Sequence, residues 1–227
     1  MRRLLLLLAT AAAAFAVVAA PAFATTECRG LQVCVPVTGP WVLASPVQVE
    51  FQLACPKRFV VGGLDAELSS RGIDIGFVGN LGSPVNPGIT TSKEAVFLGR
   101  LVHGRDPAAS FRPHIGCVPA SGGGQRTPTA YHVFKPGKPS IRHVTNIVVE
   151  PGLTRHYVKR CASNERLVAA THAIGFFGGI PPSVSLARSV QVAQSVRAGT
   201  VRLTIRATRA IAGGNAVVQL DLVCAAR

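Results

Sequence analysis

The sequence has few acidic residues and few large aromatic side chains: ten Asp and Glu stand against 24 Lys and Arg, with two Tyr and one Trp among 227 residues. It does not have the composition of a disordered chain, because 48% of its residues are apolar and 15% are charged. Its 23 glycines follow no three-residue period, which excludes a collagen. No segment carries a long apolar stripe of helical period, which argues against a helical bundle.

The common signatures of hydrolases and nucleotide-binding enzymes are also absent. The sequence has no H-E-x-x-H motif, no G-x-S-x-G elbow and no P-loop. No cysteines and histidines have zinc-binding spacing, so it indicates no metal site and no cofactor. The remaining acid–base candidates are the carboxylates of Asp65, Glu67 and Asp74, and a histidine at His114 or His172. We interpret these as strand-edge acids and hydrogen-bonded structural histidines.

Residues 1–24 have the three parts of a secretory signal peptide. Arg2 and Arg3 form a short positive region, residues 4–20 form an apolar run without charge, and residues 22–24 make a small-x-small cleavage site. The alternative, an uncleaved anchor, would need a span of about 20 apolar residues. No second apolar stretch of that length follows. We therefore expect a secreted protein without a transmembrane segment in the mature chain.

Six cysteines lie in the predicted mature region, and an even number in an exported protein indicates disulfide bonds. Cys55 precedes Cys117 by 62 residues and Cys161 precedes Cys224 by 63. These matched intervals predict the bonds Cys55–Cys117 and Cys161–Cys224. The third predicted bond is then Cys28–Cys34. Free thiols are the alternative.

The sequence around the two long bridges predicts a duplicated unit. Residues 46–53 and 151–160 both begin with proline and place an aromatic residue, Phe51 or Tyr157, four positions before the cysteine. Similar apolar runs follow each cysteine after Arg58 and Arg166. Identity between the halves is low, so the match concerns architecture and carries no information about activity.

Short runs of alternating apolar and polar residues predict half-buried strands. The runs are residues 47–55, 73–77, 201–208 and 218–224. Turn signals such as Gly62-Gly63 and Asn86-Pro87-Gly88 punctuate the sequence between such runs. Repeated short strands with Gly/Pro turns favour an all-β fold of two tandem, disulfide-closed β-sandwich-like units.

A Gly/Pro-rich segment separates the two predicted units. Residues 119–139 contain the run Ser-Gly-Gly-Gly and four prolines, which is typical of a linker; an ordered loop between the units is the alternative. We therefore expect an N-terminal β unit over 25–118, closed by Cys55–Cys117. The C-terminal β unit is expected over 140–227, closed by Cys161–Cys224.

The phrase after Cys55 resembles a known group of sequences. Residues 55–63 read Cys-Pro-Lys-Arg-Phe-Val-Val-Gly-Gly, and Cys117 follows at a distance. This resembles uncharacterised secreted, Cys-containing β-rich proteins of high-GC actinobacteria, in which Cys-Pro precedes a valine, a glycine pair and a distant cysteine. The second half departs from the pattern, because Ala162 replaces the proline and alanines replace the glycines. The resemblance implies secretion and no particular activity.

Basic charge is concentrated in the C-terminal half. Residues 25–117 hold 8 basic and 7 acidic residues, whereas residues 118–227 hold 14 and 3. This asymmetry indicates an anionic partner, such as an acidic or phosphorylated polymer of the cell envelope or a membrane surface. Nucleic acid is disfavoured, because few aromatic side chains accompany the arginines for base stacking. A compositional origin is the alternative, since Arg outnumbers Lys 19 to 5, as a GC-rich coding sequence tends to produce.

The alternation of residues 201–208 predicts which arginines contact this partner. If Val201, Leu203 and Ile205 face the core, Arg202 and Arg206 face outward, two pleats apart. Three further arginines are expected near them: Arg188, Arg197 and Arg209. Among nearby acids, only Asp221 is expected to oppose their charge. The sequence thus indicates a secreted, non-catalytic binding or structural module; the alternative is an extracellular hydrolase with an unrecognised site.

Overall fold

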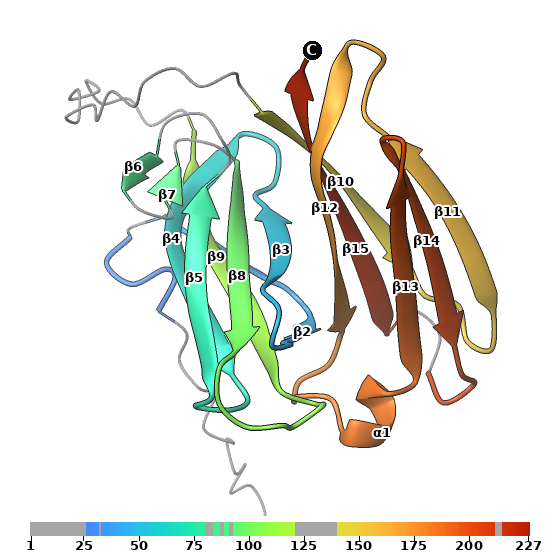
Figure 1. Cartoon of the computed structure of the whole chain (residues 1–227). Helices are drawn as coiled ribbons and strands as arrows, with labels where there is room; N and C mark the ends of the chain where they lie inside the picture. The colour runs from blue at the N-terminus through green and yellow to red at the C-terminus, as the bar shows by residue number, and fades with distance from the viewer. Residues whose placement is uncertain are drawn as a thin grey trace, which may run out of the picture.

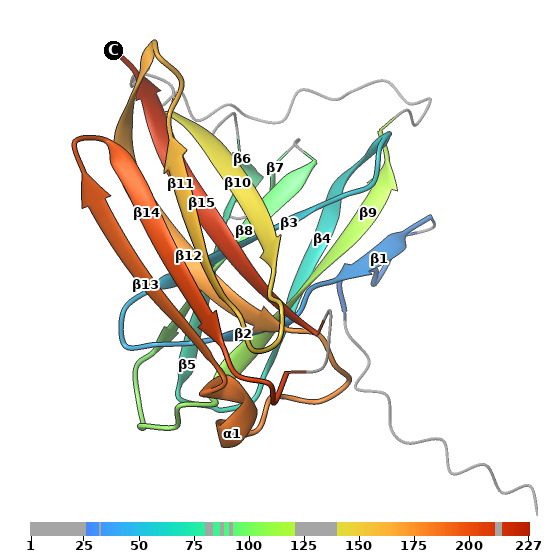
Figure 2. The same ribbon diagram turned by 90° about the vertical axis from the view of Figure 1, so that its right-hand side faces the viewer.

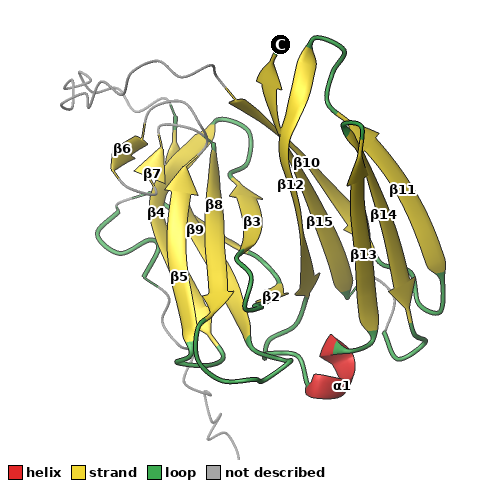
Figure 3. Ribbon diagram, viewed as in Figure 1, coloured by secondary structure: helices red, strands yellow, loops and turns green. Residues whose placement is uncertain are grey.

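The computed structural model describes residues 26–31, 33–79, 84–86, 89–90, 93–120, 140–211 and 215–227. These residues lie mostly in strands, with one short helix, α1 (Val184–Ala187), as Figure 3 shows. The expected all-β class is therefore confirmed. The predicted signal peptide and residues 121–139 of the predicted linker lie outside the described residues.

The strands of the two halves fall on either side of residues 121–139. The N-terminal strands are β1 (Val35–Thr38), β2 (Trp41–Leu43), β3 (Val49–Ala54), β4 (Phe59–Leu68), β5 (Ile73–Gly79), β6 (Pro84–Asn86), β7 (Ile89–Thr90), β8 (Glu94–Leu101) and β9 (Ser110–Pro119). The C-terminal strands are β10 (Ser140–Val148), β11 (Thr154–Arg160), β12 (Glu165–Phe176), β13 (Val190–Arg197), β14 (Thr200–Ala207) and β15 (Ala216–Ala226). The four predicted alternating runs correspond to β3, β5, β14 and β15.

Strand pairing follows the same order in both halves. In the N-terminal half, β9 lies between β4 and β1, and β8 lies between β3 and β5. In the C-terminal half, β15 lies between β12 and β10, and β14 lies between β11 and β13. The Cys55–Cys117 bond joins the end of β3 to β9, and the Cys161–Cys224 bond joins the end of β11 to β15. This correspondence favours the duplicated-unit interpretation.

The short strand β2 joins the halves into one continuous sheet. Val42 pairs with Phe111 of β9 on one side and with Gly175 of β12 on the other. Figure 1 shows β2 at the base, between the N-terminal strands in blue and green and the C-terminal strands in yellow to red. The hydrophobic core of the N-terminal half also includes Ala173 and Val217 from the C-terminal half. The halves therefore pack directly against each other.

The three disulfides are the pairs that the spacing predicts. Cys55–Cys117 and Cys161–Cys224 close the long loops, and Cys28–Cys34 closes a short one. Cys117 and Cys224 are fully buried, and each belongs to the hydrophobic core of its own half. The two long bonds thus cross-link the cores, whereas the short bond lies in the N-terminal segment.

Gly62-Gly63 does not form the predicted turn but lies within β4, at a bulge between Val61 and Gly63. A Cβ atom on Gly63 would lie 1.8 Å from the carbonyl oxygen of Glu27, and one on Gly116 would lie 2.2 Å from the same atom. The backbone of the N-terminal segment therefore packs against two glycines on neighbouring strands. Close backbone approach, rather than a turn, explains the glycine at position 63.

Candidate functional site

The exposed face of the sheet β11-β14-β13 carries the predicted arginines of β14. Val201, Leu203 and Ile205 are buried in the C-terminal core, at 0%, 1% and 3% exposure. Because side chains alternate along a strand, Arg202 and Arg206 lie on the opposite face, and both are exposed. Figure 2 shows the three strands from this outer side. The predicted orientation of these two arginines is thus correct.

Strand register brings two further arginines to this face. Thr200 of β14 lies opposite Arg160 on β11 and opposite Arg197 on β13, and both arginines are exposed. Arg160, Arg197, Arg202 and Arg206 are together called the basic face below. Arg160 was not predicted, because its place beside β14 depends on the register of β11, which the sequence does not specify.

The residues that lie opposite Arg202 and Arg206 on the neighbouring strands are uncharged. Val158 and Ser195 lie opposite Arg202. Thr154 and Gln191 lie opposite Arg206. The three strands contain no Asp or Glu at all. Each arginine on β14 therefore has no acidic cross-strand neighbour.

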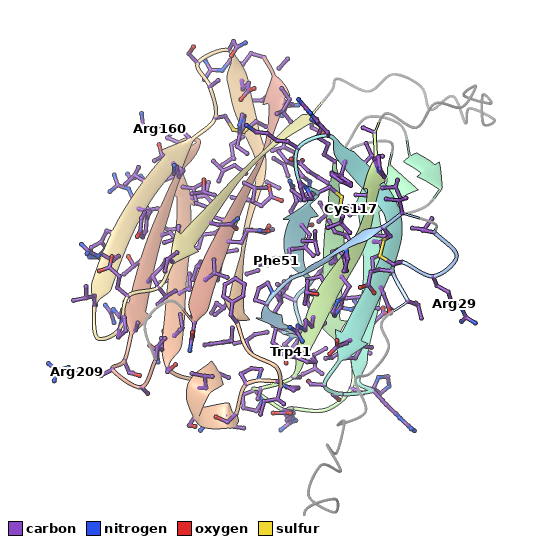
Figure 4. The ribbon with its side chains drawn as sticks, turned by 180° about the vertical axis from the view of Figure 1, so that it is seen from behind. Arg29, Trp41, Phe51, Cys117, Arg160 and Arg209 are labelled. Carbon is purple, nitrogen blue, oxygen red and sulfur yellow. A yellow bond between two sulfur atoms is a disulfide. The ribbon has the colours of Figure 1, made fainter. Side chains whose placement is uncertain are left out.

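Arg188 and Arg209 lie at one end of this sheet rather than on its face. Arg188 follows α1, which Figure 1 shows at the base of the molecule. Arg209 follows β14, and Figure 4 shows it at the outer lower corner, opposite Arg160 at the upper end of the same edge. The predicted set thus divides into Arg197, Arg202 and Arg206 on the face and two arginines at its lower end.

The acidic residues of the C-terminal half are all paired away from the basic face. Glu150 accepts a hydrogen bond from Arg155 at 2.7 Å, and Glu165 contacts His143 at 3.0 Å. Asp221 is 2% exposed and pairs with Arg142. The expectation that Asp221 opposes the exposed arginines is therefore wrong, because its side chain points into the contact between the halves.

A buried cluster of charged side chains joins the halves. Arg142 of β10 donates through Nη1 to Glu50 of β3 at 2.6 Å and to Asp221 of β15. Beside it, the Gln219 amide accepts from the backbone N–H of Gln52 at 2.6 Å and donates to the carbonyl oxygen of Gln52 at 3.0 Å. Gln219 of β15 and Arg142 of β10 thus bind β3 across the contact between the halves.

Burial raises the pKa of Asp221 above its usual value of 3.8, an effect that the positive charge of Arg142 opposes. A raised pKa means that ionisation costs more in the folded protein than in the unfolded chain. The stability of the wild type should therefore fall, relative to Asp221→Asn, as the pH rises above 3.8 through the folded pKa. Denaturant unfolding of both proteins at several pH values measures this difference. A difference that is constant with pH, or one that changes in the opposite direction, would contradict the prediction.

The acid–base candidates of the N-terminal half hold its segments together. His114 is 3% exposed, with Nδ1 lying 3.2 Å from the hydroxyl of Thr38 and Nε2 lying 3.0 Å from Glu67. Asp65 accepts hydrogen bonds from the backbone and hydroxyl of Thr26, at 2.7 and 3.2 Å. Asp74 is exposed on β5, a strand of the other sheet. These contacts favour a structural role for His114, Glu67 and Asp65.

His172 lines a cavity of about 700 Å³ between the halves. Its Nδ1 lies 2.8 Å from Oε1 of Gln194, an amide rather than a carboxylate. Asp106, which also lines the cavity, accepts a hydrogen bond from the backbone N–H of Ala108 at 2.9 Å. The cavity thus places a histidine beside a neutral partner.

Among the described residues, one group of three potential metal ligands lies within 4.8 Å: His143, Glu165 and Cys224. The Cys224 sulfur is bonded to Cys161, so it offers no thiolate. Glu165 accepts from the backbone N–H of Ala162 and contacts His143, both at 3.0 Å, and these two contacts lower its pKa. The group is therefore explained by disulfide and hydrogen bonding.

Comparison of the chain with protein-family models, with curated proteins and with solved structures finds no match in any of the three. In the described part of the chain, no helix has the length and apolarity needed to cross a membrane.

Proposed function

We propose that the protein is a secreted, non-catalytic binding module whose C-terminal half contacts an anionic polymer of the cell envelope or the extracellular medium. The observation that carries this proposal is the basic face: Arg202 and Arg206 are exposed on the central strand of a sheet whose strands contain no acid. Arginine suits such a partner, because its planar guanidinium pairs with phosphate, sulfate or carboxylate groups through two hydrogen bonds.

The rigidity of the sheet supports a binding role. Val201, Leu203 and Ile205 anchor β14 in the core, so the two arginines between them project from a fixed backbone. Exposed arginines without acidic neighbours interact with a partner's charge instead of with an internal carboxylate. Such interactions are screened by salt, and the affinity for a polyanion should fall steeply as ionic strength rises.

The alternative function, an extracellular hydrolase, would have its site in the cavity that holds His172. The hydrogen bond between His172 and Gln194 supports a binding role there, because an amide does not stabilise an imidazolium as a carboxylate does. We therefore favour binding over catalysis for this protein.

The intact chain carrying both Arg202→Gln and Arg206→Gln should elute from immobilised heparin, a sulfated polymer, at a clearly lower NaCl concentration than the wild type. Each lost contact should reduce the slope of log affinity against log salt by about one. The melting temperature should change by only a few degrees, because exposed substitutions usually cost under about 0.5 kcal/mol.

The matched control is the double change Arg71→Gln and Arg100→Gln. It removes the same charge from two exposed arginines of the N-terminal half. Its elution should stay close to that of the wild type. If both double variants lose retention equally, the basic charge has the compositional origin and the proposal is wrong.

A further inference from the structure

An open strand edge lies inside the cavity between the halves. The edge of β12 that faces away from β15 pairs with β2 only at Gly175 and Phe176, because β2 ends at Leu43. Among the described residues, no strand pairs with this edge of β12 before Gly175. The cavity is lined by residues 170–174 of this strand, by residues 43–49 and by residues 104–107.

The lining shows that the backbone of β12 faces the cavity. Successive side chains of a strand point to opposite faces, so a run of five consecutive lining residues indicates that the strand edge itself is exposed there. The Ala170 carbonyl oxygen accepts a hydrogen bond from Nε2 of Gln194 at 2.8 Å, so it points away from β15. Because backbone groups alternate in direction along an antiparallel strand, those of His172 and Ile174 point the same way.

We propose that this edge binds an extended peptide, which adds a strand to the sheet where β2 stops. Backbone N–H and C=O groups beside an apolar cavity wall need hydrogen-bond partners, and an extended peptide presents donors and acceptors at the matching spacing. Residues 170–174 can pair with about 17 Å of extended chain. A cavity of about 700 Å³ lies within the usual range for ligand sites, which often lie between packed units.

The surrounding side chains specify the kind of peptide. Leu43, Val49 and Leu101 make one part of the wall apolar, although Arg105 and Asp106 also line the cavity, and this part favours apolar side chains in the bound segment. Since Nε2 of Gln194 donates to Ala170, its Oε1 accepts from Nδ1–H of His172, at 2.8 Å. In this tautomer, Nε2 of the ring is an acceptor for a hydroxyl donor. A strand that alternates valine and threonine combines these features.

This site is separate from the basic face and does not depend on the proposed polymer binding. Gln194 comes from β13 but lies opposite Leu203, a core residue of β14, and so on the inner side of that sheet. Loss of the surface arginines should therefore leave peptide binding unchanged.

The test uses the intact protein and a fluorescein-labelled peptide, Val-Thr-Val-Thr-Val with blocked ends, followed by fluorescence anisotropy. Two variants of this peptide carry N-methyl groups, one on the odd residues and the other on the even residues, so each lacks the N–H donors of one edge only. We expect saturable binding of the parent peptide and at least tenfold weaker binding of one N-methylated variant, with the other within about threefold of the parent. Binding should also slow hydrogen exchange at the amides of His172 and Ile174.

The matched protein variants are Val47→Arg and Val196→Arg. Both valines are exposed, but only Val47 lines the cavity. Val47→Arg should weaken binding at least tenfold, and Val196→Arg should leave it unchanged. Equal affinity of both N-methylated peptides and the parent would show apolar contact without strand pairing and would overturn the proposal. Absence of saturable binding up to about 1 mM would overturn it as well, because this peptide presents both the strand backbone and the side chains that the site is proposed to bind.

Discussion

Replacement of Arg142 by methionine is expected to lower the free energy of unfolding by about 3–5 kcal/mol, because it removes the cation of a buried ion cluster. The side chains of Glu50 and Asp221 are 16% and 3% exposed, and both pair with Nη1 of Arg142. Without the guanidinium, two carboxyl groups stay close together and out of water. Chemical denaturation at neutral pH measures the loss.

Two control variants separate buried from exposed pairing. Arg155→Met removes an ion pair in which Arg155 and Glu150 are 53% and 50% exposed, and should cost much less stability than Arg142→Met, because water screens exposed charges. Replacement of all three clustered residues by apolar residues of similar size should restore much of the stability, because no unpaired charge is left. Equal losses from Arg142→Met and Arg155→Met would contradict the importance of the buried cluster.

The Arg142→Met variant should also have a looser contact between the halves. The only tryptophan of the sequence, Trp41, lies on β2, which joins the two halves, and is 4% exposed. Figure 4 shows Trp41 and Phe51 between the two halves. The fluorescence of Trp41 therefore reports on this contact. We expect its emission maximum to shift to longer wavelength at a lower denaturant concentration in Arg142→Met than in the wild type.

Removal of the Cys55–Cys117 bond by the double change to alanine is expected to cost about 4 kcal/mol, because a 62-residue loop is no longer closed in the unfolded chain. The double change that removes Cys28–Cys34 should cost only about 2 kcal/mol, since that bond spans six residues. Denaturation of the two double variants under non-reducing conditions measures both losses. A larger loss from the short bond would contradict this account.

The sequence by itself determined the alternation of four strands and the pairing of the cysteines. In β14, apolar residues at alternate positions place Arg202 and Arg206 on the outer face, because the two-residue period of a strand leaves no other orientation. The closely matched intervals of 62 and 63 residues, between Cys55 and Cys117 and between Cys161 and Cys224, predict the long bridges. Residue alternation and cysteine spacing can both be read directly from the sequence.

Only the tertiary structure decided what covers the polar face of β15. Alternation predicts that Gln219 and Asp221 lie opposite the core, and they do, yet they are 1% and 2% exposed because β3 lies over them. A period of two assigns side chains to a face but does not say whether water or another polar segment meets that face.

The candidate sites depend on contacts between distant segments. Arg160 joins Arg197 through the register of β11 and β13 on β14. The cavity beside β12 exists because β2, more than a hundred residues earlier, pairs with two residues of that strand and then ends. The strand register and the packing of the halves depend on the free energy of the whole chain. No local stretch of sequence therefore contains the information that determines them.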